Sequence, residues 1–161
     1  MTLPAPVTHP ITYLIYTSKS AVLMQQEGLT FLLAQSRKNN LSFHITGMLI
    51  YMEGRFLDKL EGRFMQFIEG DQADINALYE RILKDERHHA VLLLEKGSCA
   101  QRNFENWSMG FQSLEKRLVL DASGYFELAD CFSGIGTLSC DKRLLNYFKV
   151  FYQINNCPAE F

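Results

Sequence analysis

The sequence lacks the features that mark membrane, secreted and nucleic-acid-binding proteins. No apolar run is long enough to span a bilayer, and residues 1–10 have neither the basic nor the apolar region of a secretory signal. The formal net charge of −2 offers no broad basic surface for nucleic acid. These absences predict a cytoplasmic protein that binds no membrane and no nucleic acid, with residues 1–10 as a flexible lead-in.

Recognisable catalytic and metal-binding patterns are also missing from the sequence. The four cysteines, at positions 99, 131, 140 and 157, have no close metal-ligand spacing, and a disulfide framework would need a secreted protein. No phosphate-binding loop, Ser-His-Asp set, Cys-His set or pair of carboxylates is legible. We therefore expect reduced thiols, no bound metal and no enzymatic activity.

What the sequence does contain is a chain with regular periodicity and enough apolar residues for one core. Its 161 residues are 47% hydrophobic and 21% charged, which suits one domain with a modest addition. Helical spacing predicts a helix at about residues 26–38 and a second helix capped by Asp71 and Asp74. Apolar and β-branched runs predict strands at about residues 11–17, 45–52, 64–68, 90–95 and 107–112.

The order of these elements predicts the fold class. A βαββαββ order over residues 11–113 indicates an α+β, ferredoxin-like sandwich, with a mixed five-stranded sheet and two helices on one face. Residues 114–161 are expected to form a C-terminal helical extension, because 141–154 are amphipathic. The extension either covers the other face of the sheet or presents a surface to a partner. Its apolar stripe comprises Leu144, Leu145, Phe148, Phe151 and Tyr152.

A near-repeat with an offset of eight residues interrupts this pattern. GRFLDKLEG at 54–62 is followed by GRFMQFIEG at 62–70. Eight residues shared between the two arms of a hairpin add four to each arm, so no side chain changes face. We interpret the stretch as a lengthened hairpin, whether or not a duplication made it. The charged Asp58 then suits the protruding tip, and Gln66 suits the sheet.

Gln66 is the most unusual polar residue of the predicted core. It shares its strand face with Phe64 and Ile68, and therefore points into the layer that the helices cover. A buried amide left without partners costs about 1–3 kcal/mol, and Tyr16 on the first strand could supply one partner. The two residues form either a self-satisfied core pair or part of a site.

Two further groups of polar residues are candidates for binding a ligand. Ser36, Asn39 and Asn40 end the first helix, where their side chains could bond the carbonyl and ring nitrogens of a planar heterocycle, or simply cap the helix. Basic residues follow the second helix, where they could hold a phosphate or form a solvated helix terminus. This second group comprises Arg81, Arg87, His88 and His89, with Asp85 between them.

Taken together, these residues resemble the BLUF family, the blue-light sensors that use FAD. The match covers about residues 11–113 in order. It implies the ferredoxin-like fold, with the flavin ring between the two helices. The matching motifs are Tyr16-Thr-Ser18, Ser36-Arg-Lys-Asn39-Asn40, Ile45-Thr46-Gly47, Phe64-Met-Gln66-Phe-Ile-Glu69-Gly70, Leu78-Tyr79-Glu-Arg81-Ile, Asp85-Glu-Arg87-His88 and Trp107-Ser108-Met109-Gly110-Phe111.

The resemblance also implies a mechanism. Tyr16 would donate an electron and a proton to the photoexcited flavin, and Gln66 would bridge the two, rotating or tautomerising to give a small red shift that decays in the dark. Trp107 or Met109, which share a face and otherwise read as core residues, would be the switch in the last strand. Ser36, Asn39 and Asn40 would lie by the ring. The residues expected on the ribityl-phosphate side are Arg81, Asp85, Arg87 and His88.

These expectations define a blue-light receptor that carries FAD, or alternatively FMN, and signals by contact with a downstream protein. We also expect a homo-oligomer, and the lengthened hairpin either forms part of its interface or alters access to the site. The competing hypothesis is a ferredoxin-like binding adaptor without flavin. An acyl phosphatase is disfavoured, because residues 17–25 contain neither glycine nor arginine. Counting the family spacing without a gap would place Asp58 at the glutamine position, and we reject that alignment because it puts a charge in the site.

Overall fold

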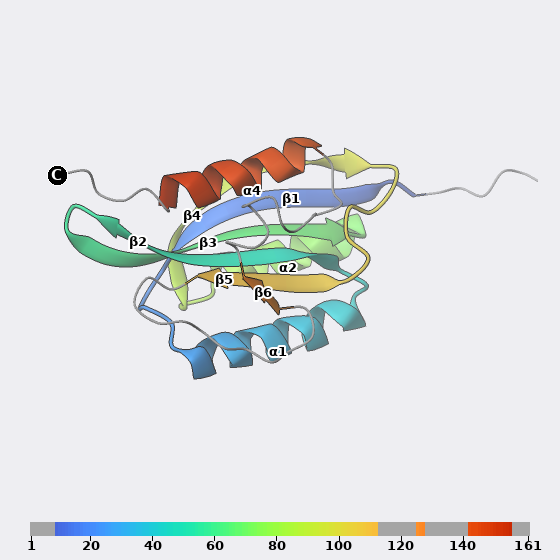
Figure 1. Ribbon diagram of the computed structural model, residues 1–161. Coiled ribbons are helices and arrows are strands. Elements are labelled where there is room, and N and C mark those ends of the chain that lie inside the picture. The colour runs from blue at the N-terminus through green and yellow to red at the C-terminus, as the bar shows by residue number, and fades with distance from the viewer. Residues whose placement is uncertain (1–8, 113–124, 128–141, 156–161) are drawn as a thin grey trace, which may run out of the picture.

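The computed structural model describes residues 9–112, 125–127 and 142–155. A single sheet with helices on both sides makes up this part of the chain (Figure 1). In chain order the elements are β1 (Ile11–Ser20), α1 (Gln26–Ser42), β2 (Thr46–Phe56), β3 (Lys59–Gly70), α2 (Gln72–Leu83), β4 (His88–Cys99), β5 (Trp107–Gln112), β6 (Tyr125–Glu127) and α4 (Lys142–Asn155).

The sheet has the strand order β4-β1-β3-β2-β5-β6. The first four of these strands pair antiparallel, whereas β5 pairs parallel to β2 and β6 pairs parallel to β5. With α1 and α2 this gives the α+β, ferredoxin-like fold. The expectation of five strands was wrong by one, because the short β6 extends the sheet beyond β5 and lies in a region with no clear strand pattern.

Both faces of the sheet are buried, and the strand alternation distributes the side chains between them. On β1, Leu14 and Tyr16 face α1 and α2, whereas Tyr13 and Ile15 face α4. The continuous apolar run of β2 is divided in the same way, with Leu49 among the first set. The apolar side chains of both strands are therefore divided between two separate core clusters, one on each face of the sheet.

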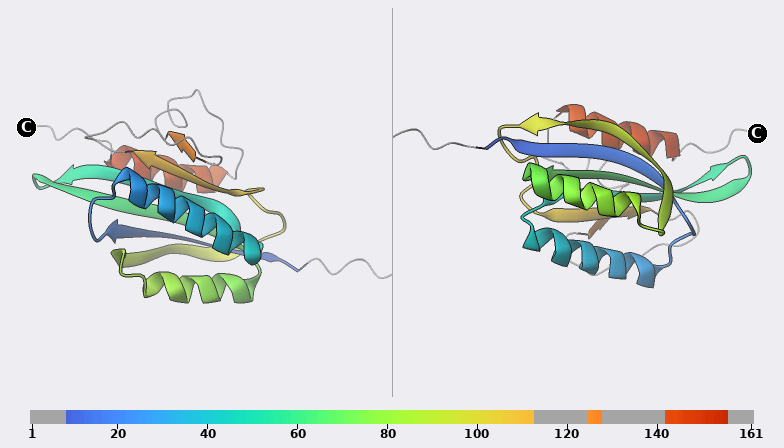
Figure 2. Two further views of the ribbon diagram at one scale, coloured as in Figure 1. Left: turned by 90° about the horizontal axis from the view of Figure 1, so that it is seen from below. Right: turned by 180° about the vertical axis from the view of Figure 1, so that it is seen from behind.

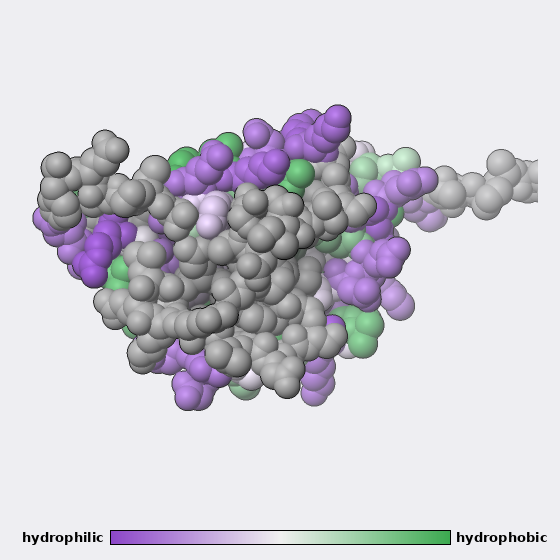
Figure 3. Space-filling view, in the orientation of Figure 1, coloured by the Kyte–Doolittle hydropathy of each residue, from purple (hydrophilic) through white to green (hydrophobic). Residues whose placement is uncertain are grey.

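Helix α4 covers the face opposite α1 and α2 (Figure 2). Its buried apolar residues are Leu144, Phe148 and Phe151, at the helical spacing that the sequence predicted. Hydrophilic side chains gather along its outward side at the upper edge of Figure 3. Among the described residues, no helix is both long and apolar enough to cross a membrane.

Strands β2 and β3 form a long hairpin that projects beyond the helical layers (Figure 1). The pairing continues to Phe56 and Lys59, and the two turn residues, Leu57 and Asp58, have φ angles of 49° and 64°. Positive φ at both central residues is typical of the type I′ turn, whose twist suits a two-residue hairpin. The lengthened hairpin with exposed Asp58 at its tip is therefore as predicted.

The start of α2 and the end of α1 were both predicted from the sequence, the first correctly and the second too early. The Asp71 carboxylate accepts a hydrogen bond from the Ala73 N–H at 2.9 Å, which confirms its prediction as the cap of α2. Helix α1, however, ends four residues later than predicted, at Ser42, and its C-cap is Phe43. Asn39 and Asn40 therefore lie inside the last turns of α1, because no glycine or proline ends the helix before them.

Candidate functional site

A cavity of about 230 Å³ lies between α1, α2 and the sheet. Its walls come from six elements, β1, α1, β2, β3, α2 and β4, and from the segments that link β1 to α1 and α2 to β4. Of the twelve candidate residues named from the sequence, His89 and Trp107 do not line it, and nine do: Tyr16, Ser36, Asn39, Asn40, Gln66, Arg81, Asp85, Arg87 and His88. The other lining residues are Met24, Leu32, Gln35, Leu49, Phe64, Leu78 and Ile82.

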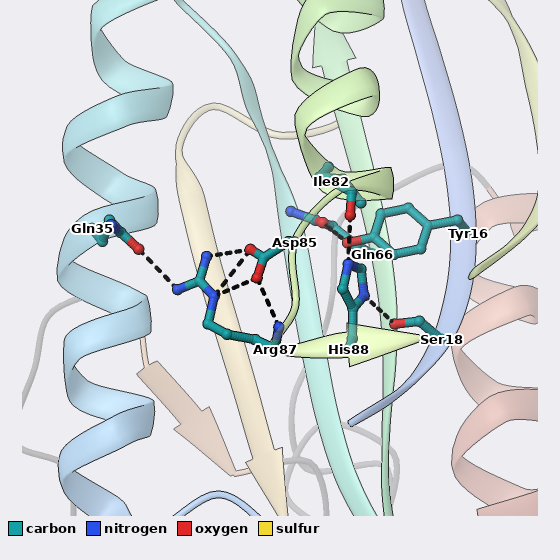
Figure 4. Close-up of polar contacts among 8 residues, drawn as sticks. All are labelled: Tyr16, Ser18, Gln35, Gln66, Ile82, Asp85, Arg87 and His88. Atoms are coloured by element: carbon teal, nitrogen blue, oxygen red, sulfur yellow. Dashed lines mark hydrogen bonds and ion pairs between the residues drawn. The ribbon is translucent and has the colours of Figure 1, made fainter. Parts of the chain in front are cut away.

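Tyr16 and Gln66 form a buried pair at the floor of this cavity (Figure 4). They lie directly opposite each other in the β1–β3 pairing, so their side chains share a face, and the Tyr16 hydroxyl donates to Gln66 Oε1. Burial is the main cause that raises the pKa of Tyr16 well above its usual value, and the nearby Asp85 carboxylate adds to it. The phenol is therefore a neutral hydrogen-bond donor at physiological pH.

Asn40 places a buried amide at the edge of the same cavity. Its side chain is only 3% exposed, and its Nδ2 atom has no hydrogen-bond partner among the described residues. Its backbone carbonyl accepts from the Ile45 N–H at 2.9 Å, which fixes the end of α1 against the start of β2. Because a buried donor without a partner is costly, Asn40 is suited to donate to a carbonyl of a bound molecule.

An ion pair connects the start of β4 to α1. Arg87 Nε and Nη2 lie 2.9 Å and 2.5 Å from the two carboxylate oxygens of Asp85, and Arg87 Nη1 donates to Gln35 Oε1 at 2.8 Å (Figure 4). The Arg87 hydrogen bonds lower the pKa of Asp85, although burial opposes them, and the same bonds raise the pKa of Arg87. Gln35 was not predicted from the sequence, although it lies four residues before Asn39 on the same helix face.

His88 lies behind the Tyr16 ring, with both of its ring nitrogens bonded to the protein. Nε2 is 2.7 Å from the Ile82 carbonyl oxygen, and Nδ1 is 2.8 Å from Ser18 Oγ. Because a carbonyl only accepts, Nε2 carries the proton, and in the neutral ring Nδ1 accepts from the Ser18 hydroxyl. The imidazole packs edge-on to Tyr16 and Phe64, at 6.1 Å and 6.3 Å between ring centroids. Ser18 belongs to the motif Tyr16-Thr-Ser18, but the sequence predicted no role for it, although it shares a strand face with Tyr16.

Arg81 and the residues of β5 complete the set. Arg81 is exposed on α2, with its guanidinium 5.6 Å from the Phe43 ring centroid. Trp107 is buried in the layer under α1 and α2 but does not line the cavity. Met109 pairs beside Leu49 in the parallel ladder, and the position of its side chain lies outside what the structure describes.

The described residues contain no cluster of three or more His, Cys, Asp or Glu side chains that could hold a metal ion. Asp58 is exposed at the hairpin tip and is not part of the cavity wall. The site therefore consists of amides, a neutral phenol and a few cations around apolar walls, which suits a flat, polar-edged aromatic molecule better than a metal.

Comparison with known proteins finds a matching protein family. The family model described as BLUF, sensors of blue-light using FAD, matches residues 11–110. A search of curated proteins found no match. The chain is similar to the dark-state structure of BlrB, a BLUF protein, at 27% identity over 65% of this chain and 73% of that one, with a TM-score of 0.54.

Two larger proteins also have similar solved structures. Klebsiella pneumoniae BlrP1 with FMN and cyclic diGMP is 26% identical over 87% of this chain and 34% of its own, with a TM-score of 0.61. A bacterial light-regulated adenylyl cyclase is 28% identical over 89% of this chain and 35% of its own, with a TM-score of 0.56. The chain thus spans about a third of the length of each of these two proteins.

Proposed function

Because the chain belongs to the BLUF family of blue-light sensors that use FAD, we propose that a flavin ring lies in the cavity between α1 and α2. Light would then change the hydrogen bonds around Tyr16 and Gln66. The observation that carries this proposal is the buried hydrogen bond from the Tyr16 hydroxyl to Gln66 Oε1, on the floor of the cavity.

The residues present fit a flavin. The buried Asn40 Nδ2 offers a donor to the polar edge of the ring, with Asn39 and Ser36 beside it on α1. Leu32 and Ile82 supply apolar surface for the ring faces. The cavity of about 230 Å³ is smaller than the roughly 300–1,000 Å³ of a typical ligand site, so it suits the ring end of the cofactor.

A bound flavin supplies absorption of blue light and, once excited, an acceptor for an electron and a proton. Tyr16 would be the donor, because its hydroxyl bonds Gln66 at the cavity, and burial keeps its proton on Oη in the dark. Gln66 suits the role of switch because its amide has an acceptor at one atom and a donor at the other. Rotation or tautomerisation of the amide reverses the hydrogen-bond direction toward Tyr16 without a change of shape.

The nucleotide end of the cofactor would lie toward Arg81 and Arg87. Asp85 already neutralises much of the Arg87 charge, so the exposed Arg81 is the stronger candidate for a phosphate. His88 would support the Tyr16 ring rather than contact phosphate, because both of its nitrogens have protein partners. FAD is the proposed cofactor and FMN the alternative, which mass spectrometry of the released chromophore distinguishes.

A spectrum of the purified protein tests the function most directly. We expect flavin absorption that shifts slightly to the red under blue light and returns in the dark. Gln66→Glu should keep the flavin and the fold but lose the normal shift, whereas Asp58→Asn at the hairpin tip should behave as the wild type. A colourless protein would favour the flavin-free adaptor, and a normal shift in Gln66→Glu would refute the role of Gln66.

The output is proposed to be contact with another protein rather than catalysis. Residues 11–113 would form the flavin-binding unit, and residues 114–161 an extension through which the signal leaves. BlrP1 and the adenylyl cyclase are much longer than this chain, so their activities are not transferred to it. Light scattering of the protein in the dark and under blue light tests the further proposal of a homo-oligomer.

A further inference from the structure

Glu69, at the end of β3, is a fully buried carboxylate whose hydrogen bonds lie outside the cavity. Its side chain is 0% exposed. Oε1 accepts from the Phe104 N–H at 2.7 Å and from Thr46 Oγ1 at 3.1 Å. Oε2 accepts from the Asn103 N–H at 2.9 Å and from Asn103 Nδ2 at 3.3 Å. Because a buried charge is tolerated only when its oxygens are bonded, these donors hold the carboxylate and are held by it.

Apart from Thr46, which begins β2, the donors belong to the segment that leads from β4 into β5. Arg102 strengthens the same junction, since its Nη1 donates to Thr46 Oγ1 at 2.9 Å and to the Glu69 carbonyl at 3.2 Å. Next to this junction, the Gly47 N–H donates to the Asn106 carbonyl at 3.5 Å, and the parallel pairing of β2 with β5 begins there. The segment is therefore fixed to β3 and β2 immediately before Trp107.

This junction also carries the chain from one face of the sheet to the other. Phe104 packs on Phe67 at 5.5 Å between ring centroids, in the core cluster that α4 covers. Three residues later, Trp107 is buried in the cluster under α1 and α2. Glu69 bonds the backbone at Phe104, just before the chain crosses to Trp107. It lies on the strand that carries Gln66, three residues away.

Gly47 shows how little freedom the neighbouring backbone has. Its φ angle is 151°, and a Cβ atom there would lie 2.1 Å from the Phe67 carbonyl oxygen. Only glycine allows β2 and β3 to approach this closely where β5 joins the sheet. The Glu69 carboxylate therefore joins the segment before β5 to a part of β3 that lies close against β2.

We propose that Glu69 is a positioning residue that couples β3 to the start of β5, so that the hydrogen-bond change at Gln66 reaches Trp107 through it. The proposal rests on the proposed function, and it adds a route by which the site moves β5. A carboxylate at position 69 can accept from both Asn103 and Phe104 because both of its oxygens are acceptors. The amide of Gln at this position would present a donor to one of them.

The experiment uses the flavin-loaded protein and compares the wild type with Glu69→Gln. Trp107 is the only tryptophan of the sequence, so its fluorescence reports on β5 alone. In the dark, amide hydrogen exchange at Asn103 and Phe104 should become at least about tenfold faster in Glu69→Gln, as loss of a charged hydrogen bond implies. Under blue light, the variant should keep the red shift but lose the change in Trp107 fluorescence that the wild type gives.

Glu53→Gln is the matched control. Glu53 is also buried, at 4% exposure, but it lies on β2 toward the hairpin and accepts from the Tyr51 hydroxyl at 3.2 Å. It should leave exchange at Asn103 and the light-driven Trp107 change at their wild-type values. If Glu69→Gln does not fold, Thr46→Val removes one donor to the carboxylate and should change the same readouts in the same direction, by less.

The outcomes separate this proposal from the proposed function. Unchanged exchange at Asn103 and Phe104, or a wild-type Trp107 response in the folded variant, would overturn the coupling. So would a wild type that shows the red shift without any Trp107 response, or an equal loss in Glu53→Gln. If the wild type gives no red shift, the proposed function fails, and the proposed route from Gln66 to β5 is overturned with it.

Discussion

Tyr13 and Tyr16 lie three residues apart on β1 and face opposite sides of the sheet. The Tyr16 hydroxyl donates to a neutral amide, and burial is the main cause of its raised pKa. The Tyr13 hydroxyl donates to the Glu95 carboxylate at 2.5 Å, and this hydrogen bond is the main cause of its raised pKa. Similar phenols on one strand therefore have different surroundings.

The two tyrosines also differ in how freely their hydrogen bonds can change direction. Tyr13 is held by charges, since Arg143 Nη2 donates to its hydroxyl at 2.7 Å and also pairs with Glu95 at 2.7 Å, while the Tyr147 hydroxyl donates to Glu95 at 2.9 Å. A phenol between fixed charges has one preferred hydrogen-bond direction. Tyr16 has a partner that can donate or accept, so its direction can reverse at low cost. We therefore expect the hydrogen bonds of Tyr13 to stay as they are under light and those of Tyr16 to change.

Removing each phenol in turn would break this comparison most clearly. Tyr16→Phe deletes the donor to Gln66, so we expect complete loss of the light-induced shift with the flavin still bound. Tyr13→Phe should keep the shift, because that hydroxyl lies on the other face of the sheet. Light-minus-dark absorption spectra measure both, and a normal shift in Tyr16→Phe would contradict the assignment.

Truncating the core under α4 tests the face of the sheet that carries Tyr13. Phe148→Ala removes a 0% exposed ring and should lower the free energy of unfolding by about 3–5 kcal/mol, as for other buried aromatic truncations. Lys149→Ala, on the exposed side of the same helix, should change it by less than about 0.5 kcal/mol. Urea unfolding followed by circular dichroism measures both, and equal effects would mean that α4 does not stabilise the sheet.

The raised pKa of Tyr16 predicts a loss of stability in alkali. Above pH 10 the phenol ionises in the unfolded chain but stays protonated in the fold, so the unfolded state binds fewer protons and stability falls as pH rises. One such group contributes up to about 1.4 kcal/mol per pH unit. Tyr16→Phe should flatten the slope between pH 10 and 11.5 by up to this amount, as urea midpoints across that range would show. An unchanged slope would mean that Tyr16 is not shielded from water.

The smallest effect is expected from the ion pair on the α4 face. Arg143→Met breaks the pair with Glu95, but the Arg143 side chain is 68% exposed, so the cost should stay below about 1 kcal/mol and shrink in high salt. The light-induced shift should be unchanged. Thermal unfolding at low and high salt measures the first expectation, and a larger, salt-independent loss would show that the pair is more buried than its exposure indicates.

Local signals in the sequence were sufficient for much of the fold. The alternation along β1 and β3 placed Tyr16 and Gln66 in one layer, and Asp71 marked the start of α2. Element ends were less predictable. The outer half of the hairpin, including Lys59, is charged and lacks apolar alternation, so its strands follow from pairing alone. Likewise, α1 continues to Ser42, past two asparagines of low helix propensity, because no glycine or proline ends it there.

The candidate site also contains residues that the sequence predicted and residues that it did not. Nine of its residues were predicted from residue type and resemblance, and they do line one cavity. Gln35 and Ser18 were not assigned a role, because their partners, Arg87 and His88, are more than fifty residues away in sequence. No local pattern records such a contact.

The sequence by itself determined the alternation that sends Tyr16 and Gln66 to one face, the helix that Asp71 opens, and a hairpin whose added length keeps every side chain on its own side. Those features depend on periodicity and on neighbours a few residues apart. The tertiary structure alone decided that Asn40 Nδ2 is buried with no partner in the described part of the chain, and that Glu69 joins β3 to the segment before β5. These depend on which distant strands pair and where loops cross the sheet, because burial and hydrogen-bond partners exist only once the chain is folded.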